Sequence, residues 1–240
     1  MIFSVVIITN GLGDNLEFVL PYWCKEFTYG IDLFLCGPQK NLINLVPQKA
    51  IIDYDEIINK ENNEIKFFSI NQKKFFATQN VNTEYIFLVH DRLFPSEDFK
   101  KTVEKRLIAS EPDFGSCDIV NISGEISVTE LRLKKNILNL SLTDALFIES
   151  RLVCNKNNKL SSDKISVNGG AFFIKTTLSK LLTRPMKWSQ MEDDILSFDL
   201  MNYNGIWIED TNLITKDLKG NINKQYGFSL KVKYLIYYLV

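Results

Sequence analysis

The sequence predicts an α/β protein in which helices cover a mostly parallel sheet. Three observations predict it: hydrophobic runs that suit strands buried on both faces, apolar residues at helical spacing between these runs, and the repeated alternation of the two. Parallel strands need crossover connections that are usually helices, so this alternation favours one open-sheet domain. We expect a single domain over residues 1–240, with a less regular C-terminal half.

The first half of the chain alternates strands and helices. FSVVIIT at 3–9 is a β-branched run typical of a buried strand, and the glycine-containing turn NGLGDN follows it. Apolar residues at helical spacing then run from Leu16 to Phe27, with Gly30 as the expected stop. The remaining expected elements are strands at 32–37 and 49–53, an edge element at 64–70, a helix at 71–81, the central strand at 85–89 and a helix at 95–110.

The second half is harder to assign. Residues 121–165 are polar and irregular, and we assign no element there. The expected elements after it are a strand that passes through Gly169 and Gly170 into a helix by residue 182, a helix at 191–205, and a strand pair at 206–210 and 212–215.

The composition indicates a globular protein without a nucleic-acid partner. Of its 240 residues, 45% are hydrophobic and 24% are charged, and the net charge of -1 lacks the basic surplus that phosphate contacts require. Met1 leads directly into the first strand without a basic leader, and no apolar run approaches the ~20 residues of a membrane span. We therefore expect a cytoplasmic protein. Its cysteines lack paired spacing and are expected to be reduced thiols: Cys24, Cys36, Cys117 and Cys154.

Three ionisable residues, His90, Asp91 and Arg92, follow the central strand. Ligands of open α/β sheets bind beyond the carboxyl ends of the strands, which favours a site here. Asp91 and His90 are an oxygen and a nitrogen ligand suited to manganese, and Arg92 is suited to clamp a phosphate. The structural alternative is an Asp–Arg pair that closes the strand.

A second candidate is the acidic cluster Glu192, Asp193 and Asp194 in the first turn of an expected helix. Mutual repulsion and the nearby Trp188 would raise the pKa of one carboxyl towards the working range of a general base. The alternative is simple capping, because the helix dipole favours acids in this turn.

Two further stretches are candidates for ligand contact. The glycines of VNGGAFFI (167–174) mark either a bulge or a close approach of backbone to a ligand. Lys73 and Lys74, at the expected start of a helix, are badly placed for the helix dipole and would favour an anionic partner. The alternative for the lysines is a solvated surface pair.

Taken in order, these motifs resemble the GT-A glycosyltransferases, in particular bacterial family 2-like enzymes of capsule and lipopolysaccharide synthesis. The resemblance rests on FSVVIITNG, NQKKFFATQNVNTEYIFLVHDR and NGGAFFIK…W…MEDD, and it spans roughly residues 2–210. It implies a Rossmann-like domain with a nucleotide-sugar-binding half (1–120), an acceptor-binding half (121–226) and a C-terminal tail (227–240).

The resemblance also implies roles for individual residues. Asp91 takes the place of a DxD-type motif that holds Mn²⁺ or Mg²⁺ on the donor diphosphate, although VHDR lacks the second acid. Asp193 is the implied base that deprotonates the acceptor hydroxyl, with Asp194 as its substitute, and Trp188 lies on the acceptor side. The remaining implied contacts of the nucleotide sugar are Thr9, Asn10, Gly11, Lys73, Lys74, His90, Arg92, Gly169 and Gly170.

The function implied is inverting transfer of a sugar, most simply from a UDP-sugar, to a glycan or lipid-linked acceptor. Two alternatives stay open: a sugar-phosphate nucleotidyltransferase, disfavoured because TNGLGDNLEF contains no basic residue, and a non-catalytic binding module of the same fold. The tail GFSLKVKYLIYYLV (227–240) combines lysines with aromatic residues, which suits peripheral contact with the inner membrane, unless it packs on the domain as a terminal helix.

Overall fold

A computed structural model describes the two halves of the chain to different extents. The acidic cluster 192–194, Trp188, Cys154 and the tail 227–240 lie outside the described residues, so the expectations for them stay predictions. The described residues are 2–12, 15–54, 65–125, Val167, 169–181, Leu196, Leu200 and 203–216.

The α/β class is confirmed, and the described strands form one eight-stranded sheet in the order β3-β2-β1-β4-β7-β6-β8-β5. Strands β3, β2, β1 and β4 are parallel, as are β6 and β8. Strand β7 is antiparallel to both β4 and β6, and β5 is antiparallel to β8. The strands are β1 (Phe3–Ile8), β2 (Leu33–Gly37), β3 (Ile51–Asp53), β4 (Tyr85–His90), β5 (Leu93–Pro95), β6 (Phe114–Asn121), β7 (Ala171–Lys175) and β8 (Gly205–Thr215).

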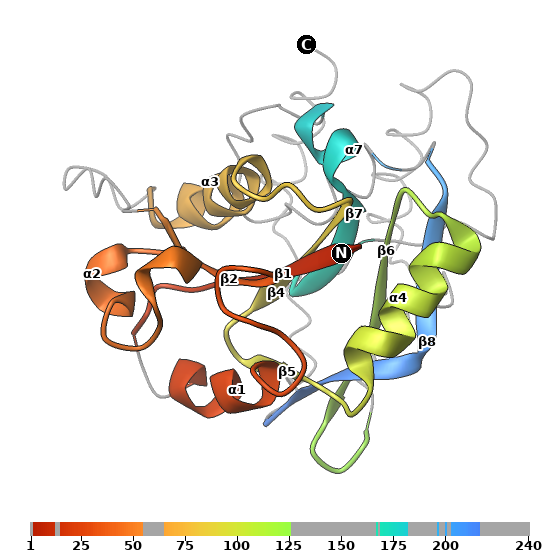
Figure 1. Cartoon of the computed structure of the whole chain (residues 1–240), viewed down its shortest axis with the longest axis horizontal. Helices are drawn as coiled ribbons and strands as arrows, with labels where there is room; N and C mark the ends of the chain where they lie inside the picture. The colour runs from red at the N-terminus through yellow and green to blue at the C-terminus, as the bar shows by residue number, and fades with distance from the viewer. Residues whose placement is uncertain are drawn as a thin grey trace, which may run out of the picture.

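Helices cover both faces of this sheet. Figure 1 shows α3 and α7 on one face and α1 and α4 on the other. No helix in the described part of the chain is both long and apolar enough to cross a bilayer. The helices are α1 (Asn15–Trp23), α2 (Gln39–Leu42), α3 (Ile65–Gln79), α4 (Phe99–Ser110) and α7 (Thr176–Leu181), with a 3₁₀ turn at Gln48–Ala50.

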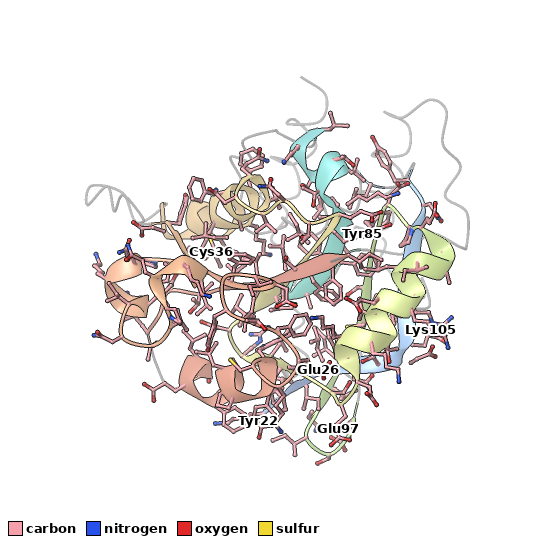
Figure 2. All side chains as sticks on the ribbon, viewed as in Figure 1. Tyr22, Glu26, Cys36, Tyr85, Glu97 and Lys105 are labelled. Atoms are coloured by element: carbon pink, nitrogen blue, oxygen red, sulfur yellow. The ribbon has the colours of Figure 1, made fainter. Side chains whose placement is uncertain are left out.

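Strand β1 is buried on both faces, as its β-branched sequence predicts. Val5 and Ile7 pack in the cluster that includes Trp23 of α1, whereas Val6 and Ile8 pack with Ala77 of α3. Figure 2 shows the same division, with Tyr22 on the side of α1 and Cys36 on the side of α3. The sheet is therefore the middle layer between two hydrophobic cores.

The expected edge element at 64–70 is wrong, because α3 already begins at Ile65. A short apolar run cannot be told from a helix segment by its pattern alone, and here the tertiary packing decides. Lys73 and Lys74 consequently lie past the second turn of α3 and not at its start.

The expected start of the next helix at Pro95 is also wrong. Pro95 ends β5 and pairs with Leu213 of β8, and α4 begins at Phe99, after Asp98 with its φ of 55°. Proline cannot donate a backbone hydrogen bond to a neighbouring strand, which matters little at the end of a strand. The segment PSEDF can therefore end β5 at Pro95 before α4 begins at Phe99.

Two assignments in the second half also change. The predicted strand pair at 206–210 and 212–215 is one strand, β8, whose register against β6 shifts between Cys117 and Asp118. The two glycines precede β7 and do not interrupt it.

We predict that Gly115→Ala lowers the free energy of unfolding by about 3 kcal/mol, because β6 passes its neighbours too closely for a side chain. A Cβ there would lie 2.1 Å from the Ile206 carbonyl oxygen and 2.4 Å from Phe173 Cζ. Gly124→Ala is the control, because a Cβ at Gly124 meets nothing within 4 Å and only its φ of 81° imposes a cost of roughly 1–2 kcal/mol. Urea unfolding measures both, and an equal loss in the two variants would contradict the steric explanation.

Candidate functional site

The predicted site residues of the first half meet at the carboxyl end of the parallel strands. Ile8 of β1 is in register with both Cys36 of β2 and His90 of β4. The antiparallel β7 begins at the same edge, where the His90 N–H donates to the Gly170 carbonyl at 2.9 Å. The sheet therefore brings segments near residues 9, 36, 90 and 170 together.

Thr9 links the turn after β1 to the turn after β4. Its buried hydroxyl donates to Asp91 Oδ2 at 2.6 Å and accepts from the Gly11 N–H at 2.9 Å. Gly11 has a φ of 65°, a conformation that favours glycine. Two predicted contacts of the nucleotide sugar, Thr9 and Gly11, are thus joined to the predicted metal ligand Asp91.

Lys73 reaches the same turn from α3. Its side chain is only 1% exposed, and Nζ donates to the Thr9 carbonyl at 3.0 Å and to Asn10 Oδ1 at 2.5 Å. Burial raises the pKa of the neighbouring Cys36 thiol to about 12, a rise that the Lys73 ammonium opposes. Lys73 is therefore a buried lysine that holds the turn after β1 through hydrogen bonds, and not a solvated surface lysine.

Lys74 contacts a different segment of the site, the two glycines that precede β7. Its Nζ donates to the Gly169 carbonyl at 2.6 Å and lies 5.8 Å from the ring centroid of Phe172. Because Lys73 and Lys74 are consecutive on a helix, their side chains leave it in different directions and fix two separate loops.

The sequence interpretation missed two residues that shape the turn. Asn41 of α2 donates from Nδ2 to the Asn10 carbonyl at 2.8 Å. Gly37, at the end of β2, lies so close that a Cβ on it would be 2.3 Å from the Thr9 carbonyl oxygen. The glycine at the end of the strand DLFLCG was the available signal for this close approach.

The metal prediction rests on Asp91 and on His90, the last residue of β4. Alternation along β4 places His90 on the same face as Ile86 and Leu88, the face that α3 covers, whereas Asp91 follows the strand. Within the described residues no three His, Cys, Asp or Glu side chains lie close enough together to hold a metal ion. A cation at Asp91 would need further oxygen ligands, and Mg²⁺ is commonly held by one or two carboxylates together with substrate phosphates.

The other predicted site residues lie outside the described part of the chain. They are Trp188, Glu192, Asp193 and Asp194.

Comparisons with known proteins identify the fold. No protein-family model matches the chain, and no curated protein matches it in sequence. TarS from S. aureus in complex with UDP-GlcNAc is 12% identical, with a TM-score of 0.57 over 100% of this chain and 66% of that chain. GalNAc-T7 with UDP, GalNAc and Mn²⁺ is 9% identical, with a TM-score of 0.57 over 99% of this chain and 48% of that chain.

A third solved structure has the same fold. The mannosyltransferase PcManGT from Pyrobaculum calidifontis, in complex with GDP-Man and Mn²⁺, is 12% identical, with a TM-score of 0.52 over 91% of this chain and 58% of that chain. The chain thus spans less than two thirds of the length of each of these structures. The likeness shows that this chain has the GT-A fold that its motifs implied.

We predict that Thr9→Val destabilises the fold by about 1–3 kcal/mol, because the Asp91 carboxylate and the Gly11 N–H both lose a hydrogen bond. Thr9→Ser keeps the hydroxyl and should cost less. Chemical denaturation of the two variants gives the difference, and a loss in Thr9→Val no larger than that in Thr9→Ser would contradict the hydroxyl as the main contribution of this residue.

Proposed function

We propose that the chain is a glycosyltransferase that takes a sugar from a nucleoside diphosphate sugar, in the first instance a UDP-sugar. The observation that carries this proposal is the fixed turn Thr9–Gly11 beside Asp91, at the carboxyl end of a GT-A sheet. Solved structures of this fold hold UDP-GlcNAc, UDP with GalNAc, or GDP-Man, which supports a nucleotide-sugar donor for this chain.

The donor would lie along the edge that Thr9 and Asp91 form. Thr9, Asn10 and Gly11 would contact the nucleoside, and His90, Asp91 and Arg92 would lie near the diphosphate. Gly169 and Gly170 would pass beneath the sugar, where the absence of side chains permits close approach. Lys74 would act on the sugar indirectly, because it holds the Gly169 carbonyl.

The acceptor would be a hydroxyl of a glycan or lipid-linked acceptor in bacterial surface polysaccharide synthesis, of the capsule or lipopolysaccharide type. Asp193 would take the proton of that hydroxyl as its oxygen attacks the anomeric carbon, with Glu192 and Asp194 beside it and Trp188 against the acceptor. The bond from the anomeric carbon to the diphosphate oxygen breaks as the new bond forms. Contact of the tail 227–240 with the membrane surface would bring the enzyme to such acceptors.

A divalent cation, Mn²⁺ or Mg²⁺, would supply positive charge to the leaving diphosphate. Asp91 would be its ligand from the described residues, and Arg92 would add a planar fork that suits phosphate oxygens. Two solved structures of this fold contain Mn²⁺, which supports the cation.

The direct test is a thermal-shift series with UDP, GDP and several sugar nucleotides, each with and without Mn²⁺. A ligand that binds the folded state at a hundred times its Kd adds about 2.7 kcal/mol of stability, which a melting curve detects. Release of UDP from the stabilising sugar nucleotide then separates an enzyme from a binding module. A protein that none of these ligands stabilises is not a nucleotide-sugar enzyme.

We predict that Asp193→Asn lowers turnover by about 10²–10⁴ while UDP affinity stays nearly unchanged, because the base acts on the acceptor. Steady-state UDP release and calorimetric titration with UDP provide the two readouts. Asp194→Asn is the matched comparison. If Asp193→Asn retains more than half of the turnover, the base is not Asp193, and a large loss in Asp194→Asn would move the role there.

We predict that Asp91→Asn weakens UDP binding only when Mn²⁺ is present. Asparagine keeps an oxygen that can accept from the Thr9 hydroxyl, so the variant removes the charge and preserves the turn. Titrations with UDP in Mn²⁺ and in a chelator give the comparison. Equal weakening in both would contradict a cation at Asp91, and a larger loss in Arg92→Gln would then indicate a metal-independent clamp.

A further inference from the structure

The contact between Lys73 and Asn10 determines which way the Asn10 amide faces. The Lys73 ammonium carries only donors, so the group that it meets on Asn10 must be the amide oxygen. The opposite orientation would place N–H donors against N–H donors. Asn10 is exposed at the carboxyl end of β1, and its NH₂ group is the part of the amide left for a ligand.

The backbone that carries this amide is held from several sides. Asn41 donates to the Asn10 carbonyl at 2.8 Å, and Lys73 donates to the preceding carbonyl of Thr9 at 3.0 Å. The Thr9 N–H in turn donates to the Cys36 carbonyl at 3.1 Å. With its backbone and its side-chain oxygen both fixed, the Asn10 NH₂ group is a preorganised donor, which lowers the entropy cost of binding.

We propose that Lys73 is a positioning residue that turns the Asn10 amide so that its NH₂ group donates to an acceptor oxygen of the bound nucleoside diphosphate. This inference rests on the proposed function and names the chemistry of one contact within it. The acceptor is either a carbonyl oxygen of the base or a phosphate oxygen. A fixed donor selects ligands with an acceptor at that point, because a ligand without one leaves the amide unpaired.

Asn10→Asp tests the inference with almost no change in shape. The aspartate keeps an oxygen for Lys73 and replaces the outward NH₂ donor with an acceptor oxygen. We expect the unliganded variant to be at least as stable as the wild type, because the retained contact becomes an ion pair with a buried ammonium. We expect its affinity for UDP to fall by about 10–100-fold, since one hydrogen bond is lost and two acceptors face each other.

Two control variants distinguish the loss of the Asn10 donor from a general effect of the added negative charge and from an effect on folding. Gln39→Glu introduces the same charge on α2, beside the same edge of the sheet, and should change UDP affinity by less than about threefold if repulsion at a distance is screened. Lys73→Met removes the group that orients the Asn10 amide. In a Lys73→Met protein, Asn10→Asp should therefore lower the UDP affinity by a smaller factor than it does in the wild type. If Lys73→Met does not fold, the opposite effects of Asn10→Asp on stability and on affinity remain a complete test.

The outcomes separate this inference from the proposed function. Wild-type protein that binds neither UDP nor GDP overturns both. Wild-type protein that binds UDP, together with an Asn10→Asp variant of equal affinity or of lower unliganded stability, overturns only the inference. Titration of uridine and of inorganic pyrophosphate then assigns the acceptor: a loss confined to uridine and UDP indicates the base, and a loss that includes pyrophosphate indicates a phosphate.

Discussion

The Thr9 hydroxyl joins the ends of two parallel strands, and the arrangement of the site depends on this link. It connects Asp91, after β4, with Gly11, in the turn after β1. The register that pairs Ile8 with His90 brings the next residue of each strand, Thr9 and Asp91, into contact. A shift of one residue in this register would turn every side chain of the strand to the other face, so the buried pattern of the strands also fixes the polar contact.

Helix α3 contacts both the turn after β1 and the glycine segment before β7. Burying an ammonium group is costly unless hydrogen bonds compensate it, and α3 buries Lys73 and Lys74 in succession. Each donates to a backbone carbonyl, one on the turn after β1 and one on the glycine segment before β7. Both lysines originate from α3, so a single helix contacts the two loops. Apolar residues at these positions would avoid the desolvation cost of a buried ammonium group, but they could not donate hydrogen bonds to the two carbonyl groups.

The strand ends that meet at this edge could be predicted from the sequence, because hydrophobic periodicity locates strands, and ligands of open α/β sheets bind beyond their carboxyl ends. The position of Asp91 directly after a buried strand makes it a candidate on this ground, whereas Thr9 and Gly11 are candidates through the resemblance to GT-A enzymes. The contacts between the three residues cannot be predicted from either. The start of α3 could not be found, since EIKFFSI suits a strand as well as a helix until tertiary packing decides. The contribution of Asn41 depends on how closely α2 approaches the turn, which no local pattern encodes. For Gly37 the glycine that ends DLFLCG was a local signal of a close approach, but not of its partner Thr9.

The reversal at β7 explains how the second half of the chain reaches a site built by the first. In a parallel strand the carboxyl end would lie at this edge, but β7 is antiparallel to β4, so its amino end lies there instead. Gly169 and Gly170, which precede Ala171, therefore come to lie beside the end of β4 and within reach of Lys74. A glycine pair before a strand is thus equivalent in position to the polar residues after the parallel strands. Their backbone carries no side chain at the edge where Asp91 and the turn after β1 present hydrogen-bonding groups.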